Sequence, residues 1–157
     1  VAGPAVAGGM ELALWCDLRV MEETSYMGVY CRRWGIPLID GGTVRLPRLV
    51  GEGRAMDLIL TGRRVDAAEA LQIGLCEYVV PDGDARTYSE ALAHDISRFP
   101  QSCLRADRNS VQNQHGLSLN QALKQEWAGS KNEVSKGIEG ATRFAKGKGR
   151  SGDFSDL

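Results

Sequence analysis

The first eighty residues alternate between short strand-like runs and segments whose apolar positions have helical spacing. Polar and apolar residues alternate over 17–21, as in a half-buried strand. Apolar side chains recur every three or four positions over 52–60, as on one face of a helix. The pattern predicts strands over 17–21, 26–30 and 75–80, and helices over 9–16, 43–50, 52–60 and 66–74.

Turn and cap signals set the limits of these elements. Residues 35–42 contain four breakers and predict a loop. Asp66 and Glu69 have the spacing of a capping box, and Gly74 is a helix terminator. In the helix over 9–16, Leu12 and Trp15 are expected on the apolar side. Pro47 is compatible with its helix only in or near the first turn.

From residue 84 onward the pattern is helical almost throughout. Breaks are expected at 99–100, 115–116, 129 and 147–149. The chain therefore reads as an α/β section over 1–81, followed by a helical section over 82–157 with a mobile end from 147.

The most informative local feature is the turn around Gly8 and Gly9, which joins an apolar run to a helix. Glycines allow other groups to approach the backbone, and the first amides of a helix have no internal acceptor. Glu11 lies one turn away. This spacing places a proton-transfer group beside a site for a negatively charged oxygen. The bland alternative is a tight turn followed by an acidic residue that the helix dipole favours.

Bulk properties exclude several classes of partner. The chain has 157 residues, a formal net charge of −1 and 43% hydrophobic residues, which suit one domain without an electrostatic case for nucleic acid or a membrane surface. The four cysteines are scattered and only two histidines are present, so zinc is not expected. Reduced thiols favour a cytoplasmic protein, or a mitochondrial one in a eukaryote. Because Val1 opens inside an apolar run, we expect a piece of a longer protein.

Motifs along the whole chain resemble those of the crotonase superfamily, also called the enoyl-CoA hydratase/isomerase superfamily. The matching stretches, in order, are GGMELAL (8–14), CDLR (16–19), Gly35, GGTVRLPRLVG (41–51), AMDLILTG (55–62), DAAEA (66–70), GL (74–75), VVP (79–81) and GATRF (140–144). The resemblance covers the later part of that fold. It implies an α/β fold: a truncated ββα spiral followed by a helical section that forms oligomers.

The resemblance also implies a function. It points to an acyl-CoA enzyme of hydratase or isomerase type, which stabilises a thioester enolate with two backbone amides. Gly8 matches the residue that supplies the second amide, and Glu11 matches the first catalytic carboxylate. No separate cofactor is implied, because coenzyme A is part of the substrate. A homotrimer or hexamer is implied, with Leu119, Leu123, Trp127, Val134 and Ile138 available on the C-terminal helices.

A second catalytic glutamate of the family would stand at Cys31, counting back without gaps from Gly41. A thiol here either fills the space of the lost side chain or acts as a thiolate near Arg32 and Arg33. Asp40 is a second candidate acid, and its plain alternative is a helix cap. The departure at Cys31 also leaves open a non-catalytic subunit that binds acyl-CoA or serves assembly.

The remaining candidates concern substrate binding. Gly9, Cys31 and Trp34 are expected near the acyl group, with Tyr26 and Tyr30 as weaker candidates. Lys146 and Lys148, with Arg150, form a basic tail that the resemblance links to the phosphates of coenzyme A. The plain alternative for that tail is a solvated, frayed terminus.

Overall fold

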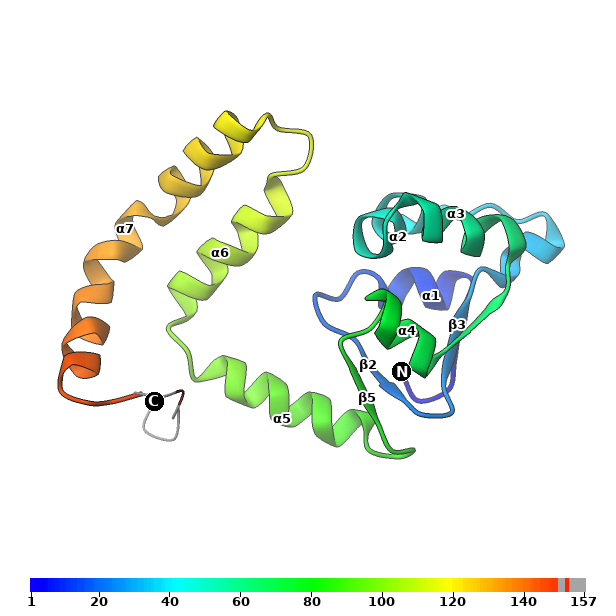
Figure 1. Ribbon diagram of the computed structural model, residues 1–157, viewed down its shortest axis with the longest axis horizontal. Coiled ribbons are helices and arrows are strands. Elements are labelled where there is room, and N and C mark those ends of the chain that lie inside the picture. Colours follow the sequence, from blue (N-terminus) through cyan, green and yellow to red (C-terminus); the bar gives the residue numbers. More distant parts are fainter. Residues whose placement is uncertain (150–151, 153–157) are drawn as a thin grey trace. The chain divides into compact units, whose positions relative to one another are not determined.

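The computed structural model describes residues 1–149 and residue 152. The chain divides into two compact units, Val1–Leu92 and Ala93–Leu157. The first unit contains short strands and helices, and the described residues of the second are largely helical (Figure 1). The predicted order, short strands and helices up to Val80 and helices afterwards, is confirmed.

Two small sheets join parts of the first unit that are far apart in sequence. Strand β1 (Pro4–Val6) runs parallel to β3 (Tyr26–Gly28), which pairs antiparallel with β4 (Arg64–Asp66). Strand β2 (Val20–Glu22) runs parallel to β5 (Tyr78–Val80). Parallel pairing needs a crossover between the strands, and α1 (Gly8–Ala13) supplies part of the one between β1 and β3.

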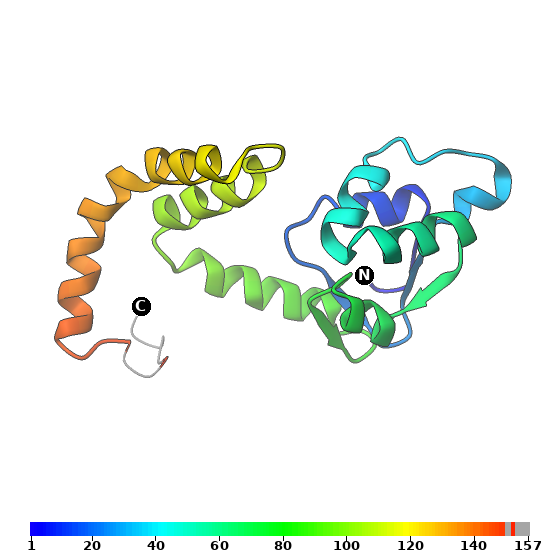
Figure 2. The ribbon, with the colours of Figure 1, turned by 45° about the horizontal axis from the view of Figure 1, so that its top comes forward.

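The helices of the first unit cover a main core, and Val20, Val80 and Ala85 form a smaller second cluster. The 3-10 helix η1 (Tyr30–Trp34) contacts α3 (Glu52–Thr61), and α2 (Gly42–Val50) packs along α3 (Figure 2). Helix α4 (Ala67–Ile73) packs against β3, β4 and β5. The largest fully buried side chains of this unit are Met10, Met21, Met27, Leu46, Leu58 and Leu75.

Helix α5 (Ala85–Ser97) leads from the first unit into the second, where α6 (Gln101–Asn113) packs against α7 (Leu119–Ala145). A capping box begins α7, in which Ser118 Oγ accepts the Gln121 N–H and Gln121 Oε1 accepts the Ser118 N–H. The predicted break at Gly129 is wrong. A helical glycine costs only about 1 kcal/mol, which a capped helix of 27 residues tolerates. No helix in the described part of the chain is long and apolar enough to cross a membrane.

The first helix corrects the sequence prediction. It spans Gly8–Ala13, and Met10, Glu11 and Leu14 are buried, whereas Leu12 and Trp15 are 61% and 56% exposed. The helix ends too early for Trp15 to lie on its inner face. The β2 strand is likewise buried at all three positions, so the half-buried interpretation of this stretch is wrong.

Two local predictions also fail. Pro47 lies in the interior of α2, beyond the first turn, where it cannot donate a helical hydrogen bond. Asp66 precedes α4, but its carboxylate makes no cap bond, because it pairs with the Arg64 side chain. Glu69 does not complete a capping box either, because it binds the Arg63 guanidinium.

Candidate active site

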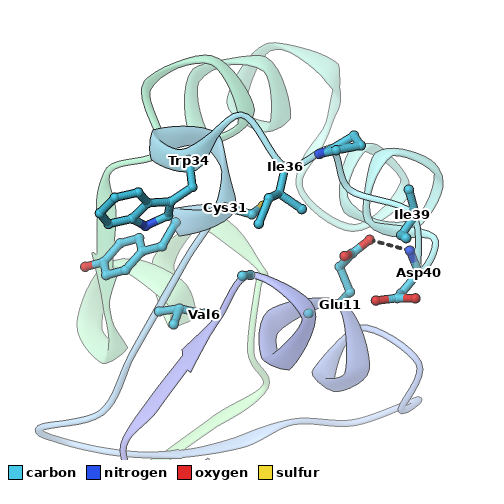
Figure 3. A pocket seen from close by; sticks show the side chains of 11 residues that line it. Val6, Glu11, Cys31, Trp34, Ile36, Ile39 and Asp40 are labelled. Atoms are coloured by element: carbon cyan, nitrogen blue, oxygen red, sulfur yellow. Dashed lines mark hydrogen bonds between the residues drawn. The ribbon is translucent and has the colours of Figure 1, made fainter.

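The centre of the site is the carboxylate of Glu11, which projects from α1 and is 3% exposed. Its Oε1 atom accepts backbone N–H bonds from Asp40 at 3.0 Å and from Gly42 at 2.7 Å (Figure 3). Among the described residues no group bonds the other oxygen, Oε2. One oxygen therefore fixes the side chain, and the other has no hydrogen bond from the described residues.

Glycines at the start of α2 make this contact possible. Gly41 has φ +96°, a left-handed conformation that favours glycine. At Gly42 an added Cβ would lie 2.8 Å from Glu11 Oε1 and 2.9 Å from its Cγ. The double glycine thus brings the backbone of the loop within bonding distance of a buried carboxylate.

Glu11 opens onto a cavity of about 470 Å³ whose lining is largely apolar. The other lining residues are Val6, Ala7, Gly8, Tyr30, Cys31, Trp34, Ile36, Pro37, Ile39 and Asp40. Figure 3 shows Glu11 and Asp40 at one end of this pocket and Trp34 at the other. The arrangement suits an apolar chain whose reactive carbons lie beside two carboxylates.

The turn before α1 brings Gly8 to the same pocket. Ala7 caps the helix with φ +52° and ψ −126°, and its N–H bonds the Gly28 carbonyl at 2.9 Å. A non-glycine residue with this backbone carries strain, which is common at functional sites. A Cβ built on Gly8 would lie 3.4 Å from Asp40 Oδ2, so the Asp40 carboxylate lies beside this turn.

Cys31 lines the same pocket from η1 and is buried in the apolar core. Both flanking arginines are engaged elsewhere. Arg32 donates to the Ile59 carbonyl at 3.1 Å, and the Arg33 guanidinium lies 4.1 Å from the centre of the Tyr30 ring. A thiol that only fills space would have this placement.

Of the other predicted binding residues, Trp34 and Tyr30 line this pocket and Gly9 does not. Gly9 lines a separate groove of about 460 Å³ with Pro4 and Leu12. Lys146 caps α7, and Lys148 lines a hollow of about 250 Å³ in the second unit, together with Arg98 and Arg143. Arg150 lies outside the described residues. The predicted mobile end from 147 also falls largely there.

Sequence reasoning missed two residues that hold the site together. Trp15 Nε1 donates to the Asp40 carbonyl at 2.8 Å, and the Arg45 guanidinium reaches the same oxygen at 3.4 Å. No sequence signal indicates these roles, because both side chains donate to a backbone atom, which lies 25 and 5 residues away in the sequence. Tyr26 does not line the pocket, and its ring lies under the Arg64 guanidinium. No group of three side chains suited to a metal ion occurs in the described part of the chain.

The first unit is thus an α/β structure in which a strained strand-to-helix turn and a buried carboxylate lie beside an apolar pocket. Known proteins agree with this class. The family described as Enoyl-CoA hydratase/isomerase matches residues 1–150. The chain therefore belongs to the enoyl-CoA hydratase/isomerase family.

Three relatives illustrate the similarity. A probable enoyl-CoA hydratase of Mycobacterium bovis, EchA8, is 42% identical over 123 residues, which cover 78% of this chain and 48% of that protein. An enoyl-CoA hydratase structure from Bacillus anthracis has a TM-score of 0.86 at 34% identity, covering 92% of this chain and 57% of that one. A candidate enoyl-CoA hydratase of Thermobifida fusca, crystallised with CoA, has a TM-score of 0.80 at 30% identity. The match covers 87% of this chain and 53% of that one. The chain spans about half the length of the relatives that it matches.

Proposed function

We propose that this chain forms part of an acyl-CoA enzyme of the enoyl-CoA hydratase/isomerase type, with Glu11 as the general acid/base. One observation carries the proposal. Glu11 is a buried carboxylate with one oxygen fixed by two backbone amides, at the end of a largely apolar pocket. Family membership and the CoA complex of the T. fusca relative support the choice of an acyl-CoA substrate.

The chemistry follows from these groups. In hydration, a water oxygen bonds the β-carbon of the enoyl thioester while the π electrons move to the carbonyl oxygen, which gives an enolate. Glu11 takes a proton from that water, and a proton then joins the α-carbon. The Gly8 amide donates to the enolate oxygen, where charge develops. In isomerisation, Glu11 alone takes a proton from one carbon and returns it to another.

Asp40 is the second carboxylate of the proposed site. Its N–H holds Glu11, and its own carboxylate lies beside Gly8. The plain alternative, a side-chain cap for α2, receives no support, because Gly41 occupies the cap position without a side-chain cap bond. We assign Asp40 to proton delivery and Cys31 and Trp34 to contact with the acyl chain.

Binding of the coenzyme A portion and assembly complete the proposal. Gly9 is the residue after Gly8 in α1 and is proposed to lie near the thioester. Lys146 and Lys148 are proposed to meet phosphates of coenzyme A. The thioester itself carries coenzyme A, so no separate cofactor is included. Exposed apolar residues on α7, among them Leu123, Val134 and Ile138, fit burial in a homotrimer or hexamer.

Replacement of Glu11 by Gln tests the proposal. The amide has nearly the same shape and still accepts the two backbone N–H bonds, but it cannot carry a proton. Turnover of a short enoyl-CoA should fall by about 10²–10⁴-fold with little change in KM. Glu90→Gln, at an exposed residue on α5, is the matched control and should keep full turnover. Equal turnover in the wild type and Glu11→Gln, with both folded, removes Glu11 from the mechanism.

Cys31 favours a second candidate function, a non-catalytic subunit that binds acyl-CoA. The buried thiol stands where the resemblance places a second glutamate, and a thiol does not activate water as a carboxylate does. This candidate predicts acyl-CoA binding by calorimetry without turnover. Under the enzyme proposal, Cys31→Ala keeps turnover, and Cys31→Glu raises water addition by returning a second carboxylate opposite Glu11.

A further inference from the structure

The carbonyl of Asp40 is held by two side chains from different helices. Trp15, just after α1, donates its indole N–H at 2.8 Å, and Arg45, in the first turn of α2, donates from its guanidinium at 3.4 Å. The Arg45 guanidinium carbon also lies 5.5 Å from the centre of the Trp15 ring, within range of a cation–π contact. The two side chains thus contact each other and donate to the same oxygen.

This carbonyl lies between the two amides that hold Glu11. The Asp40 N–H belongs to the peptide before it and the Gly42 N–H to the peptide after it, and both donate to Glu11 Oε1. A displacement of the peptide between Asp40 and Gly41, which joins these two peptides, would therefore move both donors. The orientation of the Glu11 carboxylate depends on a peptide that Trp15 and Arg45 fix from the outside.

Gly41 is shaped for this arrangement as well as for the turn. A Cβ built on it would lie 1.9 Å from Arg45 Nη1, so a larger residue here would push the guanidinium away from its present position. Trp15 is 56% exposed and lies outside the main core cluster. An exposed indole adds little to the core, so its hydrogen bond to the loop is its main structural contact.

We propose that Trp15 and Arg45 are positioning residues that fix the Asp40 peptide and, through the Asp40 and Gly42 amides, the Glu11 carboxylate. The positional claim stands on the hydrogen bonds alone. Its catalytic consequence rests on the proposed function, in which Glu11 moves a proton. Catalysis is sensitive to such positioning, since small misplacements of a reacting group cost large factors in rate.

Trp15→Phe tests the proposal, because it keeps an aromatic side chain at this position but removes the N–H donor. Amide hydrogen exchange of the purified chain, followed by NMR, should be about tenfold faster at Asp40 and Gly42, the size of one lost hydrogen bond. Trp127→Phe, on α7, is the matched control and should leave these two rates unchanged. Unchanged exchange at both amides in folded Trp15→Phe overturns the proposal.

Steady-state kinetics test the catalytic part. Trp15→Phe should lower kcat about tenfold with KM within a factor of two, whereas a general loss of folding lowers the active fraction and the Tm together. Arg45→Met should also lower kcat, but less strongly, since the Arg45 hydrogen bond to the Asp40 carbonyl is longer. This variant replaces Trp15→Phe in the test if Trp15→Phe does not fold. Arg86→Met, at an exposed residue, is its control. If Trp15→Phe exchanges faster but its kcat is unchanged, the catalytic role of the two residues is overturned. If the wild type is inactive and Trp15→Phe still exchanges faster, only the proposed function is wrong.

Discussion

Gly42→Ala places a methyl group directly against the proposed catalytic carboxylate. Gly42 is the first residue of α2, and its φ lies outside the left-handed region, so alanine fits the backbone. The new Cβ, however, would lie 2.8 Å from Glu11 Oε1, 2.9 Å from Cγ and 3.2 Å from Cδ. Non-bonded contacts are comfortable from about 3.5 Å, so the Glu11 side chain has to move away by at least about 0.6 Å.

Two consequences follow from this retreat. The 2.7 Å bond from the Gly42 amide is lengthened or lost, and a buried, poorly satisfied carboxylate costs about 1–3 kcal/mol of folding free energy. The higher helix propensity of alanine returns at most about 1 kcal/mol. Turnover should fall more steeply, by about 10–100-fold, because the proton-transfer oxygen is displaced.

The assay pairs urea unfolding, followed by circular dichroism, with loss of the ultraviolet absorbance of a conjugated enoyl thioester. Gly53→Ala is the matched control, because it lies in the first turn of α3 and its added Cβ meets no atom within 4 Å. That variant should be as stable as the wild type or slightly more stable, with full turnover. Wild-type stability and turnover in Gly42→Ala would refute the tight contact between loop and carboxylate.

Three further changes probe the strain, the thiol and a surface ion pair. Ala7→Gly should raise the free energy of unfolding by up to about 1 kcal/mol, because glycine adopts φ +52° without strain. A lower free energy of unfolding for this variant in urea titration would contradict a strained turn. An alkylating reagent should modify the exposed Cys16 faster than the buried Cys31, and fast, selective labelling of Cys31 with loss of turnover would identify a working thiolate. Arg63→Met should lower stability at pH 7 by about 1 kcal/mol or less, since both partners are over a third exposed. The Arg63 hydrogen bond lowers the pKa of Glu69 below its ordinary value, so the stabilisation is full well above that ordinary value and is lost as pH falls through the folded pKa. A stability difference that grows on acidification contradicts this.

The order of elements was predictable because it depends on local signals. Apolar spacing and glycine terminators located the helices over Gly42–Val50 and Glu52–Thr61 to within a residue. Other predictions were wrong because a nearby side chain bound the predicted capping group. The Asp66 carboxylate has the spacing of a cap, but a neighbouring arginine two residues away binds it instead. The end of α1 before Trp15 likewise could not be read from a pattern that continues beyond it.

The site was predictable in part for a different reason. Glu11 and Gly8 belong to one short motif, so spacing and resemblance together single them out. The groups that hold Glu11 lie 29 and 31 residues away and are backbone amides, which every residue carries. No residue type marks such a donor. The roles of Trp15 and Arg45 are hidden in the same way, since their target is a carbonyl oxygen.

Exchange of the α-protons of a short acyl-CoA thioester in D₂O, followed by proton NMR, tests the central claim most directly. It reports enolate formation at the Glu11 carboxylate whether the full reaction is hydration or isomerisation. The account predicts deuterium incorporation with the wild type and a loss of about 10²-fold or more with Glu11→Gln, while Glu90→Gln matches the wild type. Equal exchange rates in the wild type and Glu11→Gln would contradict the account. So would the absence of exchange in both proteins under conditions in which each is shown to bind the CoA thioester.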